Sequence, residues 1–112
     1  MLPRTGRERA WWLGVSLGAG AGEELLLRGV LLALLAGLVP GAPAFALVIA
    51  GGLCFGVAHA YQGWAGVAMT ALVGCGLDWL YVASGSLLLP IVVHALFDAR
   101  GALLSAANLG QA

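Results

Sequence analysis

The sequence predicts an all-α integral membrane protein, a bundle of about four transmembrane helices. Of its 112 residues, 62% are hydrophobic and only 9% are charged, whereas soluble domains carry about 25% charged residues. Too few polar side chains remain to keep the surface of a soluble domain in water. A bilayer takes about 20 apolar helical residues to cross, so the chain after its basic start has room for about four crossings.

The first predicted helix follows a basic N-terminus. Residues 1–10 carry three arginines, and two tryptophans come directly after them. Arginine followed by tryptophan is typical of the cytoplasmic border of a membrane helix. We therefore expect residues 1–10 to be a basic cytoplasmic N-terminus and residues 11–108 to be the transmembrane core. A signal peptide is the competing interpretation, but the apolar pattern resumes after Glu24 and continues to Val39, which favours a membrane helix.

This first transmembrane helix is expected over residues 11–38. Gly18, Gly20 and Gly22 lie within it, and glycine weakens helix interiors, so we expect a bend or a break there. Gly14, Gly18 and Gly22 also have the four-residue spacing of small residues that lets membrane helices pack closely. These glycines are therefore expected to be packing residues first.

Three further helices are expected, at residues 44–59, 64–82 and 87–106. Pro40, Gly41 and Pro43 form the turn before the first of them, and Pro90 lies in the first turns of the last. An even number of crossings would return the C-terminus to the cytoplasmic side.

Charge and cysteine content bear on partners and location. The formal net charge is zero, so no basic surface for nucleic acid is predicted; the bilayer itself is the expected partner. The two cysteines have no metal-site or disulfide spacing. The absence of cysteine pairs and of organellar signals fits a bacterial inner membrane.

Ionisable residues in the apolar runs need an explanation, because one such residue at mid-membrane costs about 2.5–3.5 kcal/mol on insertion scales. Eight of them lie within or beside these runs: Glu23, Glu24, Arg28, His59, Asp78, His94, Asp98 and Arg100. Their spacing separates structural from chemical roles.

Glu24 and Arg28 are four residues apart, so they lie on one helix face and can pair. Glu23 points about 100° away, which leaves its carboxylate free to accept a proton. The structural alternative is a three-residue salt-bridge cluster that locks helices together. Asp78 can pair with Arg28 or with Arg100 across helices, and we expect both Asp78 and Arg100 to be structural.

His94 and Asp98 also lie four residues apart on one face, where the carboxylate can orient the imidazole. The alternatives are an interhelical His–Asp contact and, for His59, an ordinary polar residue at the membrane border. Depth favours a shared site: Glu23 lies about 18 Å along the helix from Trp11, and the other three residues enter the same level from antiparallel helices.

Three segments resemble the motifs of one family, the CPBP family of intramembrane proteases, which includes type II CAAX prenyl endopeptidases and bacteriocin-immunity proteins. Residues 23–28 (EELLLR) resemble its EExxxR motif, residues 55–59 (FGVAH) its FxxxH motif, and residues 94–98 (HALFD) its Hxxx(N/D) motif. The three occur in the family's order.

The resemblance implies a glutamate-dependent intramembrane endopeptidase without a cofactor. In the family pattern, Glu23 and His59 activate a water for attack on the peptide carbonyl of a membrane-associated substrate, and His94 and Asp98 stabilise the oxyanion. Prenylated CAAX substrates are implied by part of the family. Asp98 stands where the prenyl endopeptidases carry asparagine, so it must be protonated or act by orienting His94.

Glu24 and Arg28 are supporting residues in the same pattern. Two other interpretations stay open. Glu23, His59 and His94 could furnish three zinc ligands with a fourth position for water, although there is no HExxH motif. A non-catalytic membrane scaffold or a bacteriocin self-immunity protein is the other interpretation.

Overall fold

The computed structural model describes residues 2–109, and every element within them is helical, which confirms the predicted all-α class. The elements are α1 (Gly6–Glu24), η1 (Leu25–Leu31), α2 (Leu32–Leu38), α3 (Ala44–Ala58), η2 (Ala60–Gln62), α4 (Gly63–Ser84) and α5 (Leu88–Leu109). The four helices predicted from the sequence are all present, and their boundaries differ by a few residues.

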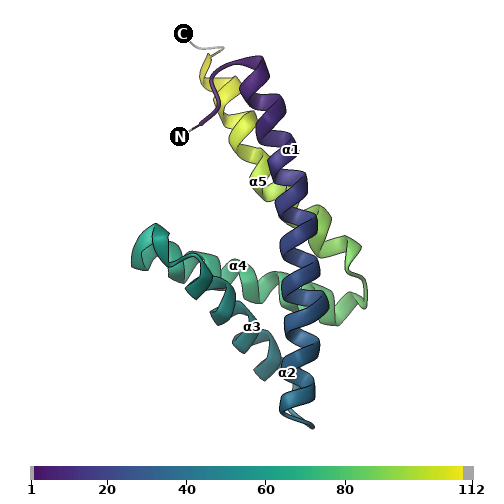
Figure 1. Ribbon diagram of the computed structural model, residues 1–112. Coiled ribbons are helices and arrows are strands. Elements are labelled where there is room, and N and C mark those ends of the chain that lie inside the picture. The colour runs from purple at the N-terminus through teal and green to yellow at the C-terminus, as the bar shows by residue number, and fades with distance from the viewer. Residues whose placement is uncertain (1, 110–112) are drawn as a thin grey trace.

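The first three elements form one continuous helix over residues 6–38 (Figure 1). It begins earlier than predicted because Thr5 and Glu8 form a capping box, in which the Thr5 side chain accepts from the Glu8 backbone and the Glu8 side chain accepts from the Thr5 backbone. The expected break at the glycines is wrong, because α1 is unbroken through Glu24. The irregularity lies after them, in the π-helix η1.

The helices form two antiparallel pairs. α5 runs back along α1, and α3 with α4 makes a second hairpin that diverges from the first pair (Figure 1). The molecule measures 56 × 29 × 17 Å, so it is long and thin. Ser105 donates a hydrogen bond to the Pro3 carbonyl, which places the start of the chain beside the end of α5.

The first helix contacts its neighbours through buried residues that occur at every fourth position. Its buried members are Ser16, Gly20, Glu24, Arg28 and Leu32. At Gly20 the backbones come so close that an added Cβ would lie 3.0 Å from the Ala95 Cβ and 3.1 Å from the Ile91 carbonyl.

The other glycines of α1 do not pack as predicted. Gly14, Gly18 and Gly22 have no heavy atom of another element within 4 Å of an added Cβ. Their four-residue spacing is the same as that of the buried residues, but it is shifted by two residues, to a face that no described helix covers. The expectation that these three glycines pack helices together is therefore wrong within this chain.

The α3–α4 hairpin depends on close contact at glycine. An added Cβ on Gly52 would lie 2.7 Å from the Cys75 nitrogen and 2.9 Å from the Ala71 carbonyl, and it would also overlap the Cys75 sulfur. Backbone atoms cannot move aside as a flexible side chain does. These contacts hold α3 and α4 together on the side of the molecule that carries His59.

Two helical segments are long and apolar enough to cross a bilayer by length and composition. They are Ala60–Ser84 and Leu88–Ser105, with mean hydropathies of 1.5 and 1.4. The apolar helix Ala44–Ala58 is shorter, and the first helix carries charged residues near its centre. Large apolar side chains such as Leu17, Leu72 and Leu103 are exposed along these helices, as expected of a surface that meets lipid.

We expect Gly52→Ala to destabilise the protein by about 1–3 kcal/mol, because the new methyl group would force apart the backbones of α3 and α4. Gly76→Ala is the matched control: it lies in α4 with nothing within 4 Å of an added Cβ, so better helix propensity should leave stability unchanged or raise it by up to about 1 kcal/mol. Unfolding in mixed detergent micelles measures both. Equal effects of the two substitutions would contradict the close contact.

Candidate active site

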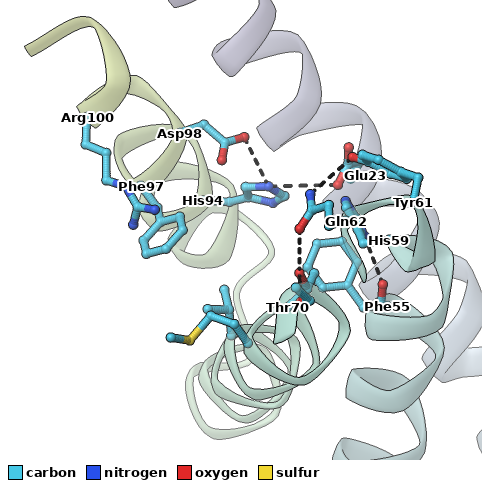
Figure 2. A pocket seen from close by; sticks show the side chains of 13 residues that line it. Glu23, Phe55, His59, Tyr61, Gln62, Thr70, His94, Phe97, Asp98 and Arg100 are labelled. Atoms are coloured by element: carbon cyan, nitrogen blue, oxygen red, sulfur yellow. Dashed lines mark hydrogen bonds and ion pairs between the residues drawn. The ribbon is translucent and has the colours of Figure 1, made fainter. Parts of the chain in front are cut away.

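A pocket of about 440 Å³ lies between the two helix pairs. Its walls include all four residues predicted to be catalytic: Glu23 from α1, His59 from the end of α3, and His94 and Asp98 from α5 (Figure 2). Segments as far apart in the chain as residues 23 and 98 therefore meet, as the depth argument predicts.

A buried ion cluster centred on Arg28 adjoins the pocket through Glu24 and His94. Arg28 Nη1 lies 3.1 Å from Glu24 Oε1, and its Nε lies 2.6 Å from Asp78 Oδ1. Its Nη2 donates to the Gly74 carbonyl at 2.8 Å. Glu24, Arg28 and Asp78 are each at most 1% exposed. The predicted Glu24–Arg28 pair is present, and of the two partners predicted for Asp78 the structure selects Arg28.

The cluster continues into the pocket through His94. Its Nδ1 lies 2.6 Å from Glu24 Oε1, so the ring donates a proton from Nδ1 to that carboxylate. Its Nε2 faces the pocket, 3.4 Å from Asp98 Oδ2 and 3.8 Å from Glu23 Oε2. The hydrogen bond on one nitrogen thus fixes which nitrogen is presented to a ligand. Figure 2 shows His94 lying between Asp98 and Glu23.

The two adjacent glutamates have opposite environments. The Glu24 side chain is fully buried and bound to Arg28 and His94, whereas the Glu23 side chain is 40% exposed and opens on the pocket. The predicted difference of about 100° between them accounts for this. Glu23 has no arginine partner among the ion pairs within residues 2–109.

His59 caps the end of α3, where the helical backbone stops. Its Nδ1 lies 2.9 Å from the Phe55 carbonyl, so the ring donates its Nδ1–H to that oxygen and Nε2 is the nitrogen left for other partners. Phe55 is buried and packs edge-on against both histidines, with ring centroids 4.5 Å from His59 and 5.9 Å from His94. The phenyl ring therefore contacts both imidazoles and restricts the space open to each.

The π-helix η1 begins directly after the two glutamates and contains Arg28. A π-helix is rare and is frequently found at functional sites. Here it lets the Arg28 side chain keep its bond to Glu24 while reaching Asp78 and Gly74 on α4. Within η1 there is no proline, and its one glycine, Gly29, follows Arg28. The sequence therefore carries no clear signal for the π-helix.

Comparison with protein families decides the class of the chain. The family model "Type II CAAX prenyl endopeptidase Rce1-like" matches residues 5–100, which include every predicted site residue. The chain belongs to this family. Searches of curated proteins and of solved structures gave no significant match.

Membership in the Rce1-like family confirms the resemblance read from the three motifs, and at family level it makes the chain a CAAX-type intramembrane protease. Together with the two long apolar helices, it identifies a membrane protein. Within residues 2–109, no three His, Cys, Asp or Glu side chains come together in the way that a metal ion requires.

Several residues of this Rce1-like pocket were missed from the sequence. They come from the turn after His59 and from the faces of α4 and α5: Tyr61, Gln62, Gly66, Met69, Thr70, Val73 and Phe97. Arg100, which was expected to be structural, also lines the pocket. The tight turn η2 brings Tyr61 and Gln62 to the rim, where the Gln62 amide bonds the Tyr61 hydroxyl and the Thr70 hydroxyl bonds Gln62 Oε1, both at 3.3 Å. The only sequence signal for Tyr61 and Gln62 is their position directly after the second motif.

We expect Arg28→Gln to destabilise the protein by about 3–5 kcal/mol, because it leaves Glu24 and Asp78 buried without their common cation. The exposed Arg7 offers the control: Arg7→Gln should change stability by less than about 0.5 kcal/mol. Unfolding of the purified variants in mixed micelles gives both values. If Arg28→Gln leaves the stability unchanged, the ion cluster contributes nothing to the fold.

Proposed function

We propose that this chain is an intramembrane endopeptidase that hydrolyses a peptide bond of a membrane-associated, prenylated CAAX-type substrate by means of a water activated by Glu23 and His59. The observation that carries the proposal is the gathering of Glu23, His59, His94 and Asp98, from three helices, on the walls of one pocket. The Rce1-like family supports the class of reaction.

Glu23 is the proposed general base. Its carboxylate is open to the pocket and its neighbour Glu24, not Glu23 itself, bonds Arg28. It is therefore free to take the proton of a water as the water oxygen attacks the carbonyl carbon of the substrate. The same carboxyl group can then deliver that proton to the leaving amine, which completes the hydrolysis.

His59 is the proposed second partner of the water. Because its Nδ1–H donates to the Phe55 carbonyl, its Nε2 lone pair remains to accept a hydrogen bond. A water that donates one O–H to this nitrogen and the other to the Glu23 carboxylate would direct its oxygen lone pairs away from both, toward the substrate carbonyl. Such positioning lowers the entropic cost of bringing nucleophile and carbonyl together.

His94 is the proposed donor to the oxyanion. Nδ1 bonds Glu24, and as an imidazolium the ring presents a second N–H from Nε2 to the pocket. Donors fixed in advance act most strongly where charge develops in a region of low dielectric. Asp98 lies 3.4 Å from this Nε2, which supports the role of orienting His94 over that of binding the oxyanion directly.

Glu24 and Arg28 act in this proposal as positioning residues. Glu24 Oε1 is shared between Arg28 Nη1 and His94 Nδ1, so the arginine holds the carboxylate that orients the histidine. We also propose that residues 1–10 lie on the cytoplasmic side of a bacterial inner membrane and that residues 11–108 form the catalytic core, as the arginines and tryptophans at the first helix favour.

Glu23→Gln should lower kcat by about 10²–10⁴-fold on a cleaved peptide, because the amide cannot accept the proton of the water. Glu8→Gln is the matched control, since glutamine also serves in a capping box and Glu8 lies outside this pocket. The assay compares wild-type protein and variants at equal amounts in proteoliposomes with a prenylated peptide.

Full activity of the Glu23→Gln variant would sink the glutamate assignment. It would instead favour the non-catalytic alternative, a membrane scaffold or a bacteriocin self-immunity protein, in which Glu23 and His59 can be replaced without loss. The zinc alternative is tested in the same assay. Stoichiometric zinc in the purified protein, with loss of activity on chelation, would make Glu23, His59 and His94 metal ligands.

A further inference from the structure

Among the described residues, Arg100 is the one cationic side chain on the pocket wall apart from the histidines. The sequence predicts a structural role for Arg100 as a partner of Asp78, but Asp78 pairs with Arg28 instead. None of the ion pairs within residues 2–109 includes Arg100. An arginine on a pocket wall without a carboxylate partner is available to bind an anion.

The guanidinium is nevertheless held in place. Arg100 folds back along α5 so that its Cζ lies 3.6 Å from the centroid of the Phe97 ring, as Figure 2 shows. Stacking on an aromatic face leaves the N–H edges of a guanidinium free, and those edges match a carboxylate with two parallel hydrogen bonds. Phe97 also lines the pocket, so the stacked group belongs to its wall.

The position of Arg100 along α5 fits the outer end of the pocket. Trp12, at the predicted membrane border, donates its indole N–H to the Asp98 carbonyl at 2.9 Å, and its ring lies against Gly101. Arg100 therefore lies at the level of Trp12, where a charged side chain reaches headgroups and water. His94 lies deeper, beside Glu23 and Glu24.

The separation matches a particular length of peptide. The backbones of His94 and Arg100 are six residues apart on a helix, which is about 9 Å along its axis, and the Arg100 side chain folds toward Phe97 within that interval. Three extended residues span about 10 Å. CAAX substrates end in three residues after the prenylated cysteine, so a scissile carbonyl beside His94 would place the chain's terminal carboxylate near Arg100.

We propose that Arg100 binds the free C-terminal carboxylate of the peptide substrate and so selects peptides that end three residues after the cleaved bond. This inference rests on the proposed function for the identity of the peptide. In this arrangement the carboxylate stays at the hydrated border, while the prenyl group points toward the membrane interior. Asp98 does not compete for the guanidinium, because its carboxylate is turned to His94.

The test uses two farnesylated peptides that differ only at the C-terminus, one with a carboxylate and one with a carboxamide. Both carry a methyleneamine in place of the scissile amide, so that neither can be cleaved, and binding to the protein in nanodiscs is measured. We expect wild-type protein to prefer the carboxylate by about 10- to 100-fold. Arg100→Gln should abolish this preference, because it should weaken the binding of the carboxylate peptide and leave the binding of the carboxamide peptide unchanged.

Arg7→Gln is the control, because Arg7 is exposed and lies outside the pocket; it should retain the preference. Arg100→Lys should retain part of it, since lysine keeps the charge and loses the two parallel bonds. The proposal is overturned if wild-type protein binds both peptides equally, or if Arg100→Gln keeps the preference.

Cleavage is measured separately with ordinary peptides. If wild-type protein shows the carboxylate preference without cleaving, the carboxylate site stands and the proposed endopeptidase function fails. If wild-type protein cleaves carboxylate and amide peptides with equal kcat/KM, the proposed function stands and the role of Arg100 fails.

Discussion

The buried guanidinium of Arg28 is the interaction on which the site depends. It joins Glu24 on the first helix to Asp78 and the Gly74 carbonyl on α4, and through Glu24 it reaches His94 on α5. Few contacts join α4 to α5 or α3 to the first helix elsewhere. A cation in an apolar interior must keep its carboxylates close, so this cluster fixes how the two helix pairs meet.

The same cluster explains why two neighbouring glutamates differ so much. Glu24 is committed to Arg28 and His94, and its burial keeps water away from that pair. Glu23, one position earlier, opens on the pocket. A helix turns its side chains by about 100° per residue, so a single step along the chain separates a structural carboxylate from one that can take part in chemistry.

Periodicity made much of this predictable. The four-residue spacings of Glu24 with Arg28 and of His94 with Asp98 hold in the structure, because both depend only on helix geometry. Contacts between helices were harder to foresee. Gly18 was expected to contact another helix, but Gly20 makes that contact with α5 instead. The spacing of small residues does not say which face of a helix has a neighbour. The π-helix and the residues of the η2 turn also depend on tertiary contacts, which a local pattern does not contain.

The distribution of the pocket over the chain has a consequence for its biogenesis. Glu23 and His59 lie in the first three-fifths of the sequence, whereas His94 and Asp98 lie on α5, which a ribosome makes after the other three helices. Until α5 inserts beside α1, Glu24 lacks its imidazole partner and the pocket lacks one wall. A chain synthesised only as far as α4 therefore carries Glu23 and His59 in the bilayer without an assembled site, and the site is complete only once α5 has inserted.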